Sequence, residues 1–195
     1  MLGDHSETDV LGIKTIFCIY NFIMPKREFS IESGNYYHLY NRGVNRGRIF
    51  FVEKNYSFFI LLLSRYFQPF ADVLAYCLMP NHFHLVIQAK SDQFLTKALH
   101  PFLLTYSKSI NKQEKRIGPL FQGRYQANFI DSDDYLLDCV KYVHLNPVKA
   151  NLVDDPSKWL YSSYQIYISG SRDTFVNTIE VLRFFDTLQD FREFS

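Results

Sequence analysis

Residues 79–88, with the sequence MPNHFHLVIQ, place two histidines, His82 and His84, inside an otherwise apolar segment. A proline and an asparagine near the start of this stretch favour a turn. Along a β-strand, residues i and i+2 point to the same face of the sheet. The stretch therefore predicts a strand over residues 82–88 that projects both imidazoles from one face and turns the apolar side chains between them toward a core. The preceding apolar segment, residues 71–79, is expected to pair with it as a hairpin.

Two imidazoles on one strand face can offer two nitrogen ligands to a single metal ion. The same spacing also occurs where two histidines are only hydrogen-bonded or partly exposed, so the pair alone leaves both interpretations open. A structural zinc site would need four ligands, and the neighbouring sequence does not supply them. Hydrolase sites of the His-x-His-x-Asp-His kind are excluded, because Val86 and Ile87 occupy the later positions.

The flanking sequence predicts a mixed order of strands and helices around this hairpin. The expected strands are residues 36–41, 71–79, 82–88 and 125–130, and the expected helices are residues 55–67, 94–115, 134–146 and 176–188. The acidic sequence DSDD at residues 131–134 indicates a helix start, and Pro147 is expected to end that helix. This order fits an α+β fold, a ferredoxin-like antiparallel sheet with helices packed on one face.

The composition favours a folded protein in a reducing compartment. Of the 195 residues, 47% are hydrophobic and 17% are aromatic, which is enough for a substantial core. The formal net charge is only +1, so any binding of nucleic acid must rest on local positive charge. The cysteines are far apart in the sequence, which argues against a disulfide framework and fits a cytoplasmic protein. They are Cys18, Cys77 and Cys139.

Three parts are expected along the chain. Residues 1–23 are expected to be an extension outside the core, because MPKREFS from Met24 resembles a natural protein start. This extension is too short and too polar to span a membrane, and it lacks a secretory signal. Residues 24–170 are expected to form the main domain, and residues 171–195 a C-terminal helical segment. The last segment holds five acidic residues against three arginines, so a basic tail that grips DNA is not evident.

A second group of polar residues lies on the helix expected from Asp134. Tyr142 and Asn146 are four residues apart and share one helix face, with Asn146 at the expected helix end. A tyrosine can act as a covalent nucleophile, and a cation held by two histidines and an amide could neutralise an attacked phosphodiester. With 14 tyrosines in the chain, an ordinary tyrosine at the edge of the core is the alternative for Tyr142. His144 is expected on the opposite side of the helix, as a packing or DNA-contact residue.

Five segments of the chain together resemble the REP-associated tyrosine transposases, which belong to the single-tyrosine HUH transposases of bacterial insertion elements. The segments are YYHLYNRGVNRGRIFF, YCLMPNHFHLVIQ, GPLFQGRYQANFI, DYLLDCVKYVHLNPVKANLV and WLYSSYQIY. The resemblance is collinear over roughly residues 24–170, and PNHFHLVI and YVHLNPVKA are its most specific parts.

The resemblance implies a ferredoxin-like fold and a metal-dependent transposase that cleaves and rejoins single-stranded DNA. Tyr142 matches the nucleophile of the family, and the residues that match its metal site are His82, His84 and Asn146. The resemblance also implies Mg²⁺ or Mn²⁺ as the cofactor and hairpin-containing DNA as the partner. Cleavage would leave a 5′-phosphotyrosine and a free 3′-OH. A homodimer is left open.

Two basic segments are expected to contact DNA phosphates. One is the loop NRGVNRGR, and the other follows the helix of residues 94–115 into the next loop. The expected contact residues are Arg42, Arg46, Arg48, Lys112, Arg116 and Arg124. Aromatic residues interleaved with the second segment could stack on unpaired bases. A solvated helix face is the alternative for the lysines, whereas a glycine before Arg124 lets the backbone approach a phosphate.

The sequence also leaves three other functions to be weighed. A domesticated DNA-binding protein without catalysis is one, although the catalytic positions are intact. A plasmid-type relaxase or replication initiator shares the His-hydrophobic-His pattern, but the LFQGRY and LNPVKA segments do not resemble those proteins. A small-molecule metalloenzyme would need a third strong ligand and a deep apolar pocket.

Overall fold

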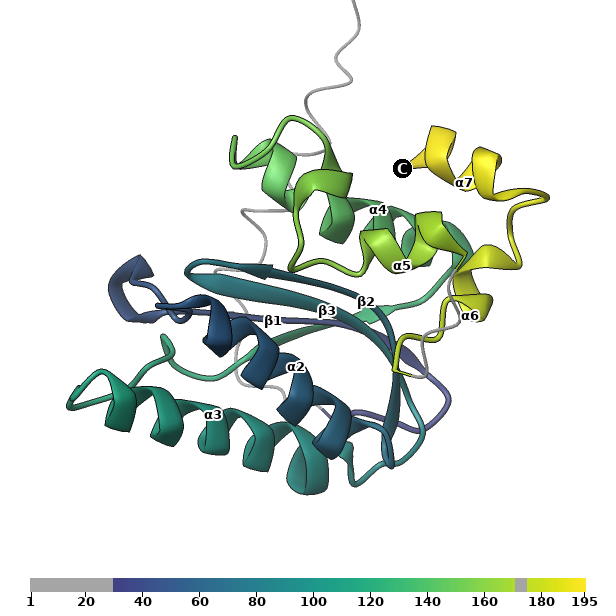
Figure 1. Ribbon diagram of the computed structural model, residues 1–195. Coiled ribbons are helices and arrows are strands. Elements are labelled where there is room, and N and C mark those ends of the chain that lie inside the picture. Colours follow the sequence, from purple (N-terminus) through teal and green to yellow (C-terminus); the bar gives the residue numbers. More distant parts are fainter. Residues whose placement is uncertain (1–29, 171–174) are drawn as a thin grey trace, which may run out of the picture. The chain divides into compact units, whose positions relative to one another are not determined.

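Four antiparallel strands form one sheet in the order β2-β3-β1-β4 (Figure 1). The computed structural model describes residues 30–170 and 175–195. The strands are β1 (Tyr36–Arg42), β2 (Ala71–Met79), β3 (His82–Ala89) and β4 (Gln126–Ile130). The predicted strands match these bounds to within one residue, and the predicted α+β class with a ferredoxin-like strand order is confirmed.

The register of the sheet places polar side chains of β1 beside the two histidines of β3. The β2–β3 hairpin turns over residues 80–81, as expected from the sequence. Tyr40 lies opposite His84, and Arg42 lies opposite His82. Directly opposite residues in an antiparallel pair project to the same face. One end of this face therefore carries two imidazoles, a phenol and a guanidinium.

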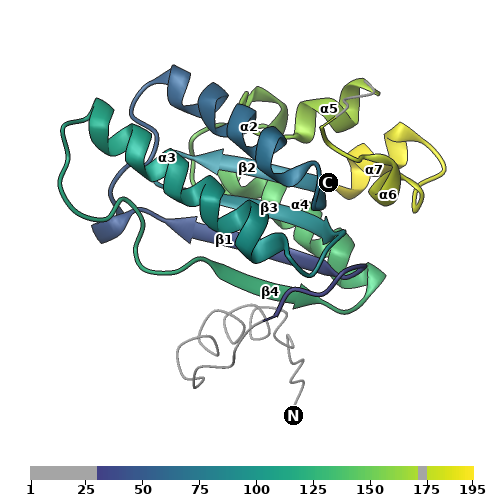
Figure 2. The same cartoon turned by 90° about the horizontal axis from the view of Figure 1, so that it is seen from below.

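Helices cover both faces of the sheet (Figures 1 and 2). Helices α2 and α3 pack on the face to which Phe83 points, and the Phe83 ring lies 5.2 Å from that of Phe59 in α2. Helix α4 packs on the opposite face (Figure 1). Its residues Tyr142 and Asn146 lie next to His84 and His82. The prediction that helices pack on one face holds for α2 and α3. Helix α4 packs on the other face and gives the fold a third layer. The helices are η2 (Val44–Arg46), α2 (Glu53–Phe67), η3 (Leu95–Leu99), α3 (His100–Gln113), α4 (Asp133–Lys149), η4 (Pro156–Lys158), α5 (Tyr164–Ser169), α6 (Ile179–Leu182) and α7 (Leu188–Phe194).

Aromatic side chains fill the layer between the sheet and helices α2 and α3. Phe59 contacts Phe102 and Tyr106 edge to face, with ring centroids 4.8 and 4.9 Å apart. The Tyr106 hydroxyl is buried and donates a hydrogen bond of 2.8 Å to the carbonyl oxygen of Ile49. Edge-to-face aromatic pairs are geometrically specific, so this layer gives β3 a rigid support.

The predicted end of α4 at Pro147 is wrong, because the helix continues to Lys149. Proline lacks an N–H and removes one hydrogen bond from the helix. Here the loss falls in the last turn, and the helix still closes through Ala150, whose N–H donates to the carbonyl oxygen of Asn146 at 3.0 Å. Asn146 therefore lies inside the helix and is buried rather than free at its end.

The single C-terminal helix expected over residues 176–188 is also wrong, because two short helices replace it. Val176 forms a β-bridge with Val73 of β2, which keeps the start of the segment extended. Thr187 then begins α7, and its side chain accepts a hydrogen bond from the N–H of Asp190. This N-cap begins a new helix, so the apolar pattern of residues 176–188 does not form one continuous helix.

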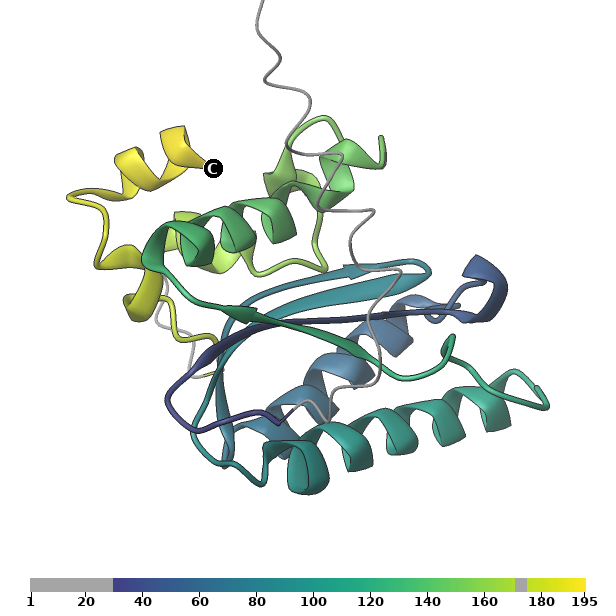
Figure 3. The same ribbon diagram turned by 180° about the vertical axis from the view of Figure 1, so that it is seen from behind.

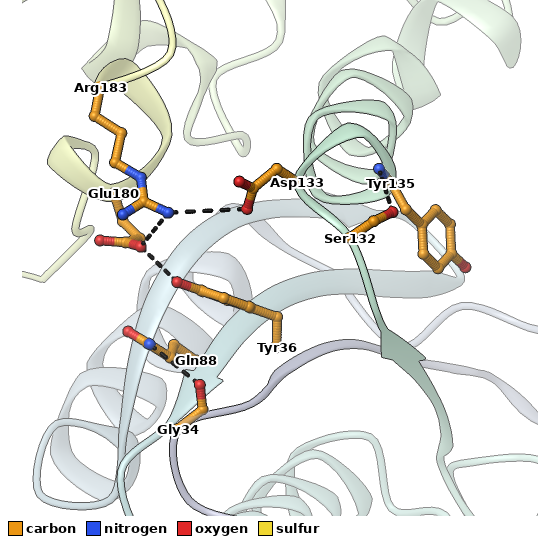
Figure 4. Close-up of polar contacts among 8 residues, drawn as sticks. All are labelled: Gly34, Tyr36, Gln88, Ser132, Asp133, Tyr135, Glu180 and Arg183. Atoms are coloured by element: carbon orange, nitrogen blue, oxygen red, sulfur yellow. Dashed lines mark hydrogen bonds and ion pairs between the residues drawn. The ribbon is translucent and has the colours of Figure 1, made fainter.

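The C-terminal helices hold the side of α4 that faces away from the sheet. Arg183 lies 3.2 Å from Glu180 and 3.9 Å from Asp133 in the first turn of α4, and the Tyr36 hydroxyl donates to Glu180 (Figure 4). Lys141 donates to the carbonyl oxygen of Phe194. β4 leads through a short turn into α4 (Figure 3), so α4 is fixed at its start and along its outer face.

The predicted domain boundaries stay predictions. Residues 1–23 lie outside the described residues, and residues 31–195 group as one compact unit. Within the described residues, Cys77 and Cys139 are buried free thiols. No helix in this part of the chain has the length and apolar content needed to cross a bilayer.

Candidate active site

Tyr142 faces the sheet from α4 and lies against two histidine rings. Its ring centroid is 5.4 Å from that of His84 and 5.9 Å from that of His38, both edge to face. The tyrosine is 40% exposed, whereas each of these histidines is only 7% exposed. The phenol thus stands where a macromolecular substrate can reach it, beside imidazoles that the protein shields from water.

His82 and Asn146 meet at the same place. Nε2 of His82 lies 3.5 Å from Oδ1 of Asn146, and Nδ1 of His82 lies 2.6 Å from Oδ1 of Asn81. The Asn146 amide nitrogen donates to the carbonyl oxygen of Tyr142 at 3.4 Å, which directs Oδ1 toward His82. The structure therefore brings together all four residues that the sequence singled out, Tyr142, His82, His84 and Asn146.

The donor set at this place suits a divalent cation. With the Asn146 amide oriented by Tyr142, an amide oxygen faces a ring nitrogen of His82. Two acceptors that face each other repel unless a proton or a cation lies between them. Amide oxygen is a ligand that Mg²⁺ and Mn²⁺ accept, whereas imidazole nitrogen is a ligand of divalent transition metals. Among the described residues no cluster of three His, Cys, Asp or Glu side chains is arranged for a metal, so this site would combine two imidazoles with the amide.

Burial keeps the histidines of the site neutral. Loss of hydration lowers the pKa of His38 to about 4 and the pKa of His84 well below its ordinary value, with His38 and His82 adding to the effect on His84. Burial also lowers the pKa of His82, and the nearby Arg42 adds to this while the contact with Asn146 opposes it. A histidine must be neutral to bind a metal, so all three rings are in the competent state near pH 7.

Sequence reasoning missed His38 and Tyr40 as residues of this site. Nε2 of His38 lies 3.0 Å from Nδ1 of His84, and the Tyr40 ring lies 5.7 Å from the His84 ring. Both residues belong to the segment YYHLYN, whose alternation predicted only a strand. The register of β1 against β3 brings these residues to the site, and that register cannot be read from the local sequence. Lys149 is a further neighbour, with its ammonium 4.7 Å from the centre of the Tyr142 ring.

His144 is a packing residue, and its alternative role as a DNA contact is wrong. Its side chain is fully buried between α4, α5 and α7, 5.1 Å from the Tyr167 ring and 6.2 Å from the Phe191 ring. Nε2 lies 2.9 Å from the hydroxyl of Ser163, which itself donates to the carbonyl oxygen of Tyr76. His144 Nε2–H is therefore the donor to Ser163, and the ring is neutral.

Acidification is expected to destabilise the protein through His144. Burial lowers the pKa of His144 from 6.5 to about 3 in the folded state. Because the unfolded chain takes up the proton first, stability is full above pH 6.5 and falls as the pH drops toward 3. The loss of unfolding free energy at pH 5 from this residue alone is about 2 kcal/mol. Urea unfolding at pH 7.5 and pH 5 measures it.

The matched variant for this prediction is His144→Gln, which keeps an N–H donor for Ser163 but cannot titrate. The pH-dependent loss of unfolding free energy should be smaller in this variant by about 2 kcal/mol. His38 and His84 titrate in both proteins, so the difference isolates His144. An identical pH dependence of the two proteins would contradict this role of the buried ring.

The two basic segments predicted from the sequence lie side by side in the structure. We call residues 42–48 the basic loop and residues 118–125 the glycine loop. The N–H of Val44 donates to the carbonyl oxygen of Leu120 at 3.0 Å, and the N–H of Gln122 donates to that of Arg42 at 2.8 Å. The basic loop also touches the β2–β3 turn, because the N–H of Gly43 donates to the carbonyl oxygen of Asn81 at 2.7 Å. Cationic side chains thus gather at the end of the sheet that carries His82.

Five of the six predicted DNA-contact residues have exposed side chains, four of them in the two loops and one near the end of α3. They are Arg42, Arg46, Arg48, Lys112 and Arg124. Arg42 is partly engaged, because its Nε donates to Gln122 at 2.8 Å. Arg116 is half-buried, with its guanidinium 5.8 Å from the centre of the Phe51 ring. Whether any of these residues contacts DNA stays a prediction.

A cavity of about 420 Å³ lies between α3 and the glycine loop. Lys108 and Arg124 line it, together with the rings of Tyr125 and His100, whose centroids are 5.8 Å apart. Asn41 also lines it, and Asn41 lies opposite Phe83, so the cavity is on the sheet face away from His82 and His84. Its size is within the range of small-molecule sites, and its lining combines positive charge with aromatic surface.

Comparisons with known proteins agree with the fold and with the resemblance seen in the sequence. The chain matches the family described as "Transposase IS200 like" over residues 32–146. A Haemophilus influenzae protein whose name assigns it as a REP-associated tyrosine transposase is 29% identical over an alignment of 109 positions, which covers 49% of this chain and 60% of that protein. A solved structure of the REP-associated tyrosine transposase bound to a REP hairpin aligns with a TM-score of 0.58 at 17% identity, covering 75% of this chain and 86% of that chain. The match thus spans less than two thirds of the curated relative.

Proposed function

The chain belongs to the IS200-like transposase family, and we propose that it cleaves and rejoins single-stranded DNA through Tyr142. Membership of the family supports a transposase that binds and cleaves DNA. The proposed ligands of a divalent cation are His82, His84 and Asn146. One observation carries the proposal. The accessible phenol of Tyr142 lies beside the buried, neutral imidazole of His84, and the amide oxygen of Asn146 faces His82.

The proposed chemistry is a transesterification at phosphorus. The Tyr142 oxygen forms a bond to the phosphorus of a DNA phosphodiester, and the bond from phosphorus to the 3′ oxygen of the leaving strand breaks. The phenol loses its proton to solvent, and the leaving oxygen takes one up as a free 3′-OH. The other strand stays attached as a 5′-phosphotyrosine. Attack by a second 3′-OH reverses the bond changes, so rejoining needs no ATP.

A bound Mg²⁺ or Mn²⁺ would neutralise charge on the non-bridging phosphate oxygens and orient the phosphate. The protein's own part is to hold the ligands still. Packing of α4 between the sheet and the C-terminal helices fixes Tyr142 relative to the histidines. Arg42, next to His82 in the sheet, adds a positive charge where the phosphate would lie.

The proposed substrate is hairpin-containing single-stranded DNA, and the choice rests on the two cationic loops and the aromatic cavity. The structural similarity to a transposase solved with a REP hairpin motivates this choice. The basic loop and the glycine loop would bind the phosphate backbone beside the nucleophile. The cavity lined by Tyr125 and Arg124 would take an unpaired base, because aromatic stacking tolerates any base and the cations would pair with its phosphate.

Arg124→Ala is expected to weaken DNA binding without changing which DNA is preferred. Loss of one phosphate contact should reduce the slope of log K against log salt by about 0.7 for a single strand. Fluorescence anisotropy with labelled oligonucleotides at several salt concentrations measures both quantities. Arg65→Ala is the matched control, because Arg65 is exposed in the last turn of α2, at the other end of that helix from the basic loop. Equal salt slopes in both variants would remove Arg124 from the interface.

The proposed function is tested with labelled single-stranded oligonucleotides that cover both flanks of the protein's own gene. They are incubated with the protein and Mn²⁺ and separated on a denaturing gel. A slow band that contains both protein and DNA is the expected result. Hairpin binding without any such band would favour the alternative, a domesticated DNA-binding protein that has lost catalysis.

A further inference from the structure

We infer that Asn81 and His38 are positioning residues that hold His82 and His84 with Nδ1 protonated and Nε2 free. The inference rests on the proposed function in taking the two histidines as cation ligands. A neutral imidazole carries one N–H, and only its other nitrogen can bind a metal. The hydrogen-bond partner of Nδ1 therefore decides whether Nε2 is available in each ring.

Asn81 fixes His82 because its own amide is fixed from the other side. The Asn81 Nδ2 donates to the main-chain carbonyl oxygen of Arg46 at 3.0 Å. A carbonyl oxygen can only accept, so the amide presents Oδ1 to His82. This Oδ1 lies 2.6 Å from Nδ1 and also can only accept, so Nδ1 carries the proton. Nε2 of His82 then keeps its lone pair, directed at Oδ1 of Asn146.

The basic loop holds in place the Arg46 carbonyl oxygen that orients Asn81. Asn45 and Arg46 adopt left-handed backbone conformations, with φ of 53° and 58°. Gly43 allows the loop to close, since a Cβ there would lie 2.0 Å from the carbonyl oxygen of Gly47. The loop conformation therefore places the Arg46 carbonyl against Asn81. A loop that we propose to bind DNA thus also orients a proposed cation ligand.

His38 has the same relation to His84 across the β1–β3 pair. Nε2 of His38 lies 3.0 Å from Nδ1 of His84, and both rings are buried. One of these nitrogens must donate and the other accept. If His38 donated, the proton of His84 would sit on Nε2 and block a cation. Only donation by His84 Nδ1–H leaves its Nε2 free, as in metal sites where the second ring nitrogen is hydrogen-bonded.

The test is the tautomer of each ring in the metal-free protein at pH 8, read from ring ¹⁵N chemical shifts. Wild-type protein should show Nδ1–H for both His82 and His84, whereas free histidine favours Nε2–H. Asn81→Ala should move His82 alone toward Nε2–H. His38→Phe, which keeps the ring volume, should move His84 alone. Asn81→Asp keeps an acceptor for Nδ1 and should retain the wild-type tautomer.

Affinity for Mn²⁺ gives a second readout, measured by titration with electron paramagnetic resonance. Asn81→Ala and His38→Phe should each weaken binding by about 10- to 100-fold, as is usual when a partner of a metal ligand is lost. Asn146→Ala is the control, because it removes a proposed ligand. It should weaken Mn²⁺ binding while both tautomers stay as in the wild type.

Nε2–H in either ring of the wild-type protein would overturn the inference. Unchanged tautomers in both Asn81→Ala and His38→Phe would overturn it as well. The tautomer measurement uses neither DNA nor metal, so it is independent of catalysis. A protein with the expected tautomers that binds no Mn²⁺ and forms no adduct would contradict the proposed function alone.

Discussion

Tyr142→Phe is expected to abolish the covalent protein–DNA adduct and to lower strand cleavage on the order of 10³-fold or more, as when other enzymes lose their nucleophile. The substitution removes one oxygen atom and keeps the ring that contacts His84 and His38. Folding and DNA binding should therefore be unchanged. The measurement compares wild-type and variant protein on the denaturing gel, with anisotropy on the same oligonucleotides.

The matched control for this prediction is Tyr40→Phe. Tyr40 is the other tyrosine whose ring contacts His84 among the described residues, at 5.7 Å against 5.4 Å for Tyr142. It lies on β1, opposite His84 in the sheet. We expect the adduct to persist in Tyr40→Phe. Loss of the adduct in Tyr40→Phe with retention in Tyr142→Phe would exchange the roles of the two residues.

The sequence predicted the parts of the site that depend on local periodicity. Alternation along residues 82–88 placed His82 and His84 on one face, and helical spacing placed Tyr142 and Asn146 together. Both relations hold in the structure. They hold because strand and helix periods are fixed by backbone geometry and do not depend on the rest of the fold.

The remaining features of the site depend on contacts between distant parts of the chain. His38 is 46 residues from His84, and only the register of β1 against β3 brings them together. The burial that makes His144 a packing residue comes from α5 and α7. The local rule that proline ends a helix gave the wrong end for α4, because a lost hydrogen bond in a last turn is tolerated when packing supplies the stability.

His82→Ala is expected to reduce Mn²⁺ affinity and DNA cleavage together. Loss of a direct ligand should raise the Kd for Mn²⁺ on the order of 100-fold or more, beyond the effect of losing an outer partner. The side chain is half-buried beside Asn146, so its removal leaves the sheet and α4 in place. Cleavage should recover in part at high Mn²⁺ concentration, because the other two proposed ligands remain.

The control for His82→Ala is His100→Ala, which removes an exposed imidazole from α3 on the opposite side of the sheet. Mn²⁺ affinity should not change in this variant. The comparison separates a specific ligand from a general loss of histidine. His82→Ala leaves Tyr142 and the proposed DNA-contact residues unchanged. This protein should therefore still bind DNA, and it should form the adduct slowly. Full-rate cleavage by His82→Ala protein at low Mn²⁺ would mean that the cation, if one is needed, is held elsewhere.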